Sequence, residues 1–215
     1  MKHNVLETIY ASLYGAFGPQ HWWPGETPLE IAVGAILTQN TNWKNVEKAI
    51  QNLKTNKVLS ARALHTIDPA ALASLIRPAG YYHVKTGRLK NFIGFLVAEY
   101  RGSVKLMARE TLPVIRNKLL SVNGIGQETA DSMLLYALGL PVFVIDAYTK
   151  RILSRHGILG HDLPYATYQH LFHSGIRNNV RLFNEYHALL VRLAKDFCRT
   201  TPCCNRCPLE GLGNG

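Results

Sequence analysis

The chain has 215 residues, and 47% of them are hydrophobic, which is enough for one large domain or for two smaller domains that share a core. Its formal net charge of +10 favours a polyanionic partner over a small-molecule substrate. The first ten residues contain no apolar core of signal-peptide length, and no run approaches eighteen apolar residues. We therefore expect a soluble, cytoplasmic protein without a membrane partner.

Helical patterning begins near the N-terminus. Apolar residues recur at helical spacing from Val5 to Leu13, so we expect a first amphipathic helix there. The stretch Trp22-Trp23-Pro24 then places two adjacent tryptophans in a loop. Such a pair either packs on the domain beneath it or faces a ligand, and the residues alone leave both interpretations open. A second helix is expected from Pro28 to Leu37, because proline suits a first helical position and the following apolar residues share one face.

Four polar residues interrupt the apolar pattern after Leu37. The stretch Thr38-Gln39-Asn40-Thr41 precedes a third helix, which is expected from Trp43 to Leu53. A buried helix end needs capping groups, so the simplest interpretation is that Thr41 or Asn42 caps this third helix.

A basic helix follows an aromatic turn in the middle of the chain. After a short helical segment between Ala61 and Ile76, the turn Gly80-Tyr81-Tyr82 directly precedes a helix that carries Lys85, Arg88 and Lys90. An aromatic tip beside a basic face is typical of nucleic-acid binding. A tyrosine pair that covers the core, beside a solvated basic face, fits the same residues equally well.

A glycine-rich turn follows the helix expected from Leu112 to Leu120. Gly124 and Gly126 bracket one apolar residue and can adopt backbone angles that are closed to other residues. A second helix is expected to begin in the turn Gln127-Glu128-Thr129. Its start leaves backbone N–H groups beside the positive end of the helix dipole, which is typical of a phosphate site.

A single acidic residue ends an apolar run. Asp146 follows Val142 to Ile145 and precedes an amphipathic segment from Tyr148 to Arg155, so we expect it at a helix N-terminus. Taken alone, this position is explained by an aspartate that caps the helix.

Two further helices are expected over residues 165–172 and 185–197. Strand-like alternation is absent along the chain, and no internal repeat or low-complexity tract occurs. The predicted fold class is therefore all-α.

All four cysteines lie close together near the C-terminus, at Cys198, Cys203, Cys204 and Cys207. In an intracellular chain such clustering favours metal binding over disulfides.

The hairpin and Asp146 together resemble the helix-hairpin-helix DNA glycosylases of the endonuclease III superfamily. In that family a hairpin of the form L-x-G-[VI]-G-x-x-T-A holds the DNA backbone, and an aspartate in V-x-x-D-x-[HY] acts in catalysis. The resemblance implies a six-helix domain over residues 26–138 and a discontinuous second helical domain over residues 1–25 and 139–215. It implies a catalytic role for Asp146 and double-stranded DNA with a damaged base as the partner, with no obligate protein partner.

The resemblance also assigns DNA contacts. Gln39 and Tyr81 match positions that wedge into the base stack. Backbone contacts are expected from one residue of the basic helix and from the hairpin, namely Lys85, Asn123, Gly124, Ile125, Gly126, Gln127 and Thr129.

Superfamily members that also cleave the strand carry a lysine two residues after the second hairpin glycine. Here that residue is Glu128, which cannot form the imine that a lysine nucleophile forms. A monofunctional glycosylase is therefore predicted, with AP-lyase activity absent or weak.

The aromatic residues are similar to those of the 3-methyladenine DNA glycosylase III branch. The implied base pocket contains Trp22, Trp23, Pro24, Trp43 and Glu128. An N-alkylated purine carries positive charge, which an indole face attracts. The predicted substrate is therefore an N-alkylated purine such as 3-methyladenine. Two alternatives remain open, a glycosylase for oxidised pyrimidines or mismatched bases and a non-catalytic DNA-binding module.

By the same resemblance, the spacing C-x5-C-x2-C of Cys198, Cys204 and Cys207 is close to the [4Fe–4S] loop of endonuclease III relatives. Their fourth cysteine lies about six residues further on, where this chain has Gly213. Cys203 could complete the four thiolates that such clusters use. A zinc site with the same four sulfurs, or a reduced loop without metal, is the alternative.

Overall fold

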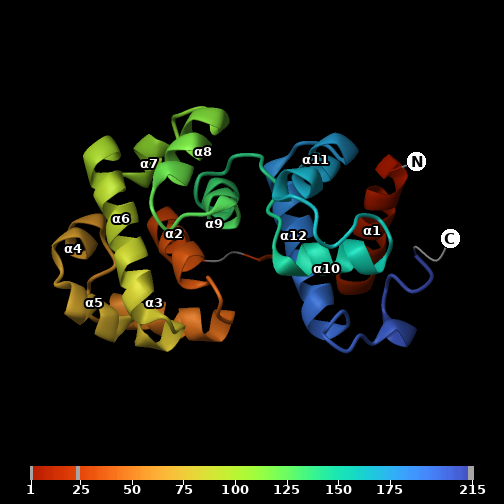
Figure 1. Cartoon of the computed structure of the whole chain (residues 1–215), viewed down its shortest axis with the longest axis horizontal. Coiled ribbons are helices and arrows are strands. Elements are labelled where there is room, and N and C mark those ends of the chain that lie inside the picture. Colours follow the sequence, from red (N-terminus) through yellow and green to blue (C-terminus); the bar gives the residue numbers. More distant parts are fainter. Residues whose placement is uncertain (1, 23–24, 213–215) are drawn as a thin grey trace. The chain divides into compact units, whose positions relative to one another are not determined.

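The computed structural model describes residues 2–22 and 25–212, and these residues form helices, turns and extended loops without a β-strand (Figure 1). The all-α prediction is therefore confirmed. The chain divides into two compact units. We call residues 23–140 the middle unit, and residues 1–22 together with 141–215 the terminal unit. Among the described residues, no helix is both long and apolar enough to cross a membrane.

The middle unit is built around the long helix α6, which packs against α2, α4, α5 and α7. Its described elements are α2 (Pro28–Leu37), α3 (Trp43–Thr55), α4 (Ala61–Thr66), α5 (Pro69–Leu75), the 3₁₀ turn η1 (Arg77–Ala79), α6 (Tyr82–Tyr100), α7 (Val104–Met107), α8 (Leu112–Ser121), α9 (Gln127–Ser132) and the π-helical turn η2 (Met133–Ala137). Side-chain caps begin several of these helices. Asn42 caps α3, because its Oδ1 accepts a hydrogen bond from the Asn45 N–H at 3.1 Å, as expected for this polar stretch.

Helix α2 also lies in the core of the middle unit. Most of its residues are buried, and it packs against η2, the turn that continues α9. In η2 the backbone widens to π-helical spacing, and the Leu138 N–H donates to the Met133 carbonyl at 3.0 Å. This packing fixes the direction in which α9 leaves the glycine hairpin.

The terminal unit joins the first helix of the chain to the last. Its described elements are α1 (Lys2–Phe17), α10 (Ala147–Arg155), α11 (Tyr165–Gly175), α12 (Val180–Asp196) and the 3₁₀ turn η3 (Cys204–Arg206). The Phe143 and Phe172 rings stack in its core with centroids 3.6 Å apart. Helix α12 begins five residues earlier than expected, because Asn179 caps it by accepting from the Leu182 N–H at 3.0 Å.

Candidate functional site

The hairpin between α8 and α9 is closed by backbone hydrogen bonds between residues three positions apart. The Val122 N–H donates to the Leu119 carbonyl at 3.1 Å, and the Ile125 N–H donates to the Val122 carbonyl at 3.0 Å. Gly124 has a φ of +94°, which requires glycine, whereas Gly126 has a φ of −89°, which other residues also adopt. The expectation of special backbone angles therefore holds for Gly124 and is wrong for Gly126.

The two glycines also differ in their surroundings. A Cβ added at Gly124 would collide with the aliphatic part of the Arg88 side chain, whereas one at Gly126 would meet no atom within 4 Å. Fold and packing therefore explain the glycine at 124 only. Helix α9 begins beside Gly126 without a side-chain cap from any described residue. The hairpin thus presents a bare stretch of main chain at a helix start.

Gln39, the predicted wedge, is bound to the hairpin in this structure. Its Nε2 donates to the Gly124 carbonyl at 3.1 Å and to the Thr129 Oγ1 at 2.9 Å, and Arg88 donates to its Oε1. Asn91 of the same helix as Arg88 donates to the Asn123 carbonyl at 3.1 Å. Side chains from α6 and from the turn after α2 therefore bind the Asn123 and Gly124 carbonyls of the hairpin.

The second predicted wedge, Tyr81, is exposed at the start of α6. Its side chain is 72% exposed, and its backbone is left-handed with a φ of +45°. This combination is uncommon for a bulky aromatic residue. The structure therefore leaves the Tyr81 ring accessible to a ligand.

The basic residues of α6 bind the protein itself. The buried Lys85 Nζ donates to the Leu37 and Ala79 carbonyls, each at 2.8 Å, and Lys90 donates to the Ile67 and His65 carbonyls. Burial, and after it the nearby Arg88 guanidinium, lower the pKa of Lys85 to about 8. The expected contact of Lys85 with the DNA backbone is wrong, because its ammonium group binds carbonyls at two helix ends inside the unit.

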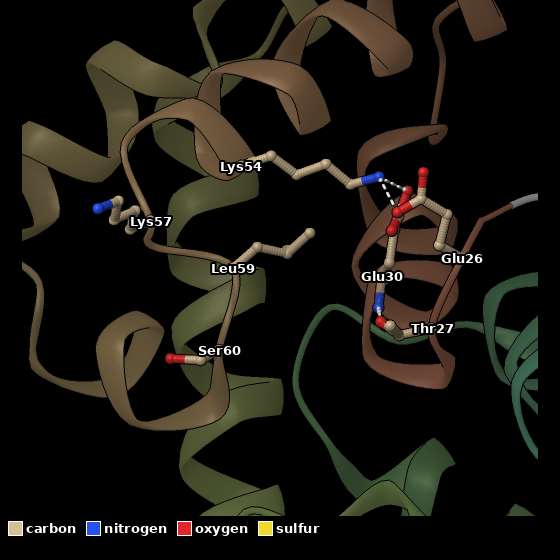
Figure 2. Close-up of a pocket in the computed structure, with 7 residues that line it drawn as sticks. All are labelled: Glu26, Thr27, Glu30, Lys54, Lys57, Leu59 and Ser60. Carbon is tan, nitrogen blue, oxygen red and sulfur yellow. Dashed lines mark hydrogen bonds and ion pairs between the residues drawn. The ribbon is translucent and has the colours of Figure 1, made fainter.

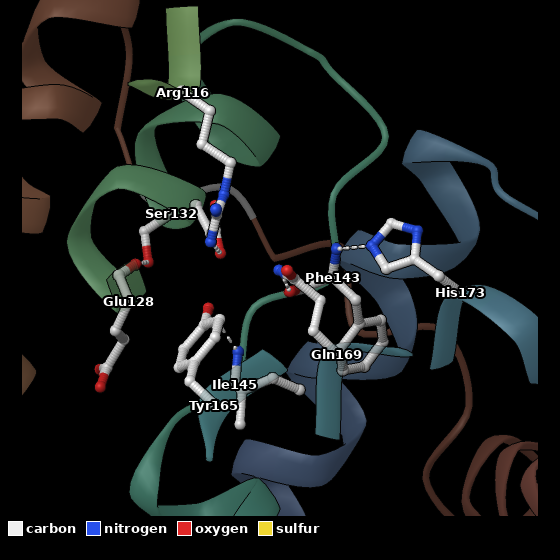
Figure 3. Close-up of polar contacts among 9 residues, drawn as sticks. Arg116, Glu128, Ser132, Phe143, Ile145, Tyr165, Gln169 and His173 are labelled. Carbon is white, nitrogen blue, oxygen red and sulfur yellow. Dashed lines mark hydrogen bonds and ion pairs between the residues drawn. The ribbon is translucent and has the colours of Figure 1, made fainter. Parts of the chain in front are cut away.

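A buried ion pair joins the two helices of the hairpin. Arg116 of α8 donates through Nε to the Asp131 Oδ1 at 2.7 Å and through a terminal nitrogen to Oδ2 at 3.1 Å. Asp131 is fully buried, and Figure 3 shows Arg116 near the helix that carries Glu128 and Ser132. This bidentate pair fixes the angle between α8 and α9. The sequence did not predict this pair, because no local pattern links Arg116 to Asp131, fifteen residues later in the chain.

In the terminal unit, side chains of α11 hold the extended segment that ends at Asp146. The Phe143 N–H donates to the His173 Nε2 at 3.2 Å, Gln169 donates to the Phe143 carbonyl at 2.9 Å, and the Ile145 N–H donates to the Tyr165 hydroxyl at 3.2 Å (Figure 3). These partners lie four residues apart on one face of α11. They replace the neighbouring strand that an extended backbone otherwise needs.

Asp146 caps α10, as its sequence position predicts. Its Oδ1 accepts a hydrogen bond from the Thr149 N–H at 2.7 Å, and its Oδ2 lies 3.6 Å from the Nε2 of the buried His187. Burial raises the pKa of Asp146, but His187 and the Thr149 contacts together lower it further than burial raises it, so the pKa lies below its usual range. The carboxylate is therefore ionised at neutral pH although its side chain is only 14% exposed.

The predicted base-pocket residues lie in both units. Trp22, in the terminal unit, stacks on the His187 ring with centroids 5.8 Å apart. Trp43, in the middle unit, begins α3 and packs over Gly34, and Glu128 is exposed on the hairpin. The remaining two, Trp23 and Pro24, lie outside the described residues.

The C-terminal cysteine loop is held by α10. Arg155 donates to the Arg199 carbonyl at 2.6 Å and lies 3.4 Å from the Cys198 Sγ, and Arg151 donates to the Cys198 carbonyl at 2.8 Å. Burial, and then the nearby Cys198 and Cys204, raise the pKa of the Cys207 thiol. Even so, no three His, Cys, Asp or Glu side chains in residues 2–22 and 25–212 are arranged to hold a metal ion. The ligand set expected for a cluster or for zinc, including Cys203, is therefore not assembled here.

One open pocket in the middle unit is unrelated to these residues. It has a volume of about 310 Å³, and Lys54 crosses it to reach Glu26 at 3.0 Å and Glu30 at 2.9 Å (Figure 2). The remaining lining residues are Thr27, Lys57, Leu59 and Ser60. Because its charges neutralise one another and it contains none of the predicted site residues, we do not assign the function to it.

The glycine hairpin and Asp146 both lie within a stretch of the chain that matches a known family. Residues 33–174 match the family model described as HhH-GPD superfamily base excision DNA repair protein. The chain belongs to this superfamily and is a base excision repair DNA glycosylase with an endonuclease III-like fold.

Individual relatives span nearly the whole chain. A protein of Methanocaldococcus jannaschii, whose name places it among the DNA repair glycosylases, is 46% identical over 98% of this chain and 97% of its own length. The crystal structure of the H. pylori 3-methyladenine DNA glycosylase MagIII, bound to 1,N6-ethenoadenine, matches with a TM-score of 0.77 at 26% identity, over 90% of this chain and 97% of that chain. The structure of a non-covalent endonuclease III–DNA complex matches with a TM-score of 0.85 at 20% identity, over 100% of this chain and 95% of that chain, which demonstrates the shared fold.

Proposed function

We propose that this glycosylase removes an N-alkylated purine, such as 3-methyladenine, from double-stranded DNA, and that Asp146 is its catalytic carboxylate. The observation that carries the proposal is the ionised, oriented carboxylate of Asp146 at the start of α10. The likeness to a solved 3-methyladenine DNA glycosylase supports the choice of substrate.

The proposed reaction is hydrolysis of the bond between the base and its sugar. The enzyme must first extrude the nucleotide, because the reacting carbon is out of reach inside the stack. Cleavage then develops positive charge on the sugar, and a nearby carboxylate stabilises this charge or orients the attacking water. The water oxygen bonds to the sugar carbon, the base leaves with the electrons of the broken bond, and the proton that the water loses passes to the Asp146 carboxylate or to solvent. A positively charged base leaves more easily, so stacking plus one carboxylate can suffice.

DNA binding is assigned to the hairpin and the two wedges. Gly126 supports this assignment, because the fold does not need a glycine at this position. A phosphate that closely approaches the backbone does need a residue without a side chain there. Gln39 and Tyr81 are proposed to fill the space that the extruded base leaves. The base-pocket roles of Trp22, Trp23, Pro24, Trp43 and Glu128 stay predictions, and their physical basis is that an indole face attracts a cationic base.

We further propose that the glycosylase does not cleave the strand, because Glu128 occupies the position of the lyase lysine. A [4Fe–4S] cluster in the cysteine loop stays a prediction, with zinc or no metal as the alternatives. We assign no step of the reaction to a metal. Iron and zinc analysis of the purified protein, with its visible absorption spectrum, distinguishes the three states.

The decisive experiment measures base release from duplexes that contain a 3-methyladenine analogue, thymine glycol or a G·T mismatch. Wild type and Asp146→Asn are compared with and without later alkali, and asparagine is chosen because it also caps helices. Release of the alkylated base by the wild type only, with strand breaks only after alkali, supports the proposal. Release of thymine glycol or a mismatched base instead would show that the proposed substrate is wrong. Strand breaks without alkali would contradict the inference from Glu128 that the enzyme does not cleave the strand. Tight binding without any release would favour a non-catalytic module.

A further inference from the structure

A buried histidine lies against the carboxylate of Asp146. His187 is on α12, is 5% exposed, and places its Nε2 3.6 Å from the Asp146 Oδ2. Nothing in the sequence connects these residues, which lie forty-one positions apart on different helices. The pair is also not explained by helix capping, because the capping bond uses the other carboxylate oxygen.

The His187 ring is fixed by aromatic neighbours. Trp22 stacks on it at an interplanar angle of 23°, and Phe143 meets it edge-on at 80° with centroids 6.4 Å apart. Phe143 is itself fixed in position, because α11 binds both its N–H and its carbonyl. The imidazole plane, and with it the direction in which Nε2 points, is therefore determined by packing.

We propose that His187 is a positioning residue for the reaction, which holds the Oδ2 of Asp146 in a fixed direction while the Thr149 N–H holds Oδ1. This inference rests on the proposed role of Asp146. At 3.6 Å the contact is longer than a hydrogen bond, so Oδ2 keeps lone pairs for a sugar or a water. In such buried surroundings even this contact has a strong electrostatic effect on the carboxylate.

Other ionisable groups on the helices packed around Asp146 and His187 make their contacts with other residues. On α10, Lys150 lies over the Tyr168 ring, and Arg151 donates to the Cys198 carbonyl. On α12, Glu185 accepts from the Gln20 N–H at 2.6 Å. On α1, Tyr10 packs against Tyr186. The described contacts therefore leave His187 as the ionisable neighbour that acts on Asp146.

Two substitutions distinguish the role of the His187 ring nitrogen from the role of its aromatic ring. His187→Phe keeps an aromatic ring beside Trp22 and loses the nitrogen, whereas His187→Gln keeps an N–H donor and loses the ring. The matched controls are His170→Phe and His170→Gln, because His170 is exposed on α11. Each variant is tested for single-turnover base release from pH 5 to 9, for DNA affinity and for thermal unfolding.

We expect His187→Phe to lower the single-turnover rate about tenfold to 100-fold with unchanged DNA affinity, and His187→Gln to recover much of that loss. The acid limb of the pH profile should move to higher pH in His187→Phe, because its carboxylate has lost the neighbour that favours ionisation. The His170 variants should match the wild type. The proposal would be overturned if His187→Phe had the rate and pH profile of the wild type. It would also be overturned if both His187 variants lost the same fraction of the rate and this loss paralleled their loss of thermal stability.

A measurement on the wild type covers the case in which His187→Phe does not fold. The carboxyl carbon resonance of Asp146, followed by NMR through a pH titration, should give a pKa below the usual range of an aspartate, because the effect of burial is outweighed by His187 together with the Thr149 contacts. An ordinary or raised pKa of Asp146 would contradict the coupling. Asp146→Asn separates the two ideas. If it abolishes release while His187→Phe has no effect, only this inference fails, and if it releases base normally, the proposed role of Asp146 fails and the inference fails with it.

Discussion

The glycine hairpin and the Asp146 segment both lead into a helix, but they are built in opposite ways. Side chains of Gln39 and Asn91 bind the carbonyls on the inner side of the hairpin, and Gly126 leaves its main chain open to a partner. In the Asp146 segment, α11 binds the main chain, and the functional group is one largely buried carboxylate. The first region therefore offers backbone to a ligand, whereas the second offers a side chain.

The largest effect should come from Asp146, the side chain that the terminal unit is proposed to contribute to the reaction. We expect Asp146→Asn to reduce single-turnover base release by about 100-fold to 1,000-fold, because the developing sugar charge loses its carboxylate. Thermal stability should change little, since asparagine also caps helices. Asp162→Asn is the matched control, because the Asp162 side chain is 96% exposed. A residual rate near that of the wild type would remove Asp146 from the chemistry.

The middle unit should respond most strongly at its main chain. Gly126→Val should weaken DNA binding about tenfold or more at a fixed salt concentration and leave unfolding unchanged, because a Cβ at this position meets no protein atom within 4 Å and the added side chain covers the exposed backbone. Gly124→Ala should do the reverse and destabilise the fold by about 1 to 3 kcal/mol, because alanine resists a positive φ and collides with Arg88. Fluorescence anisotropy and thermal melts measure both quantities. If Gly126→Val bound DNA as the wild type does, the hairpin would not be the contact surface.

The two regions also differ in how far their sequence reveals them. The hairpin glycines and the acid after an apolar run are local patterns, and these patterns correctly predicted the hairpin, the helix starts and the capping position of Asp146. The partners that hold both regions come from distant elements. Gln39 reaches the hairpin from the turn after α2, Arg88 reaches it from α6, and His187 reaches Asp146 from α12, so no local spacing could predict these contacts.

Lys85 is the clearest failure of local reasoning. On a helical wheel it lies with Arg88 near an aromatic turn, which is typical of a DNA-binding face. In the structure its ammonium binds two carbonyls at helix ends, because these orphan acceptors need donors that the helices themselves lack. The extended segment before Asp146 is a similar case. Its apolar run is strand-like in composition, but its partners are α11 side chains.

The support of the Asp146 segment by α11 can be tested separately. Gln169→Met keeps the length of the side chain but removes the donor to the Phe143 carbonyl. We expect it to destabilise the protein by about 1 to 2 kcal/mol, because a buried carbonyl loses its partner. Base release should fall a few-fold with unchanged DNA affinity, because the segment positions Asp146. A loss of affinity without a loss of rate would contradict the division between a binding region and a chemical region.

The expected effect of Lys85 is confined to the pH dependence of stability. Burial lowers the pKa of Lys85 to about 8 in the folded state, whereas an unfolded chain holds this proton up to about pH 10.4. Between these values the unfolded state binds more protons, so the free energy of unfolding should rise with pH across this window. Urea unfolding at pH 7, 8, 9 and 10 measures the slope, and Lys85→Met should reduce it. Because the ammonium is buried, the same variant should bind DNA with the salt dependence of the wild type, whereas a shallower dependence would return Lys85 to the DNA-binding surface.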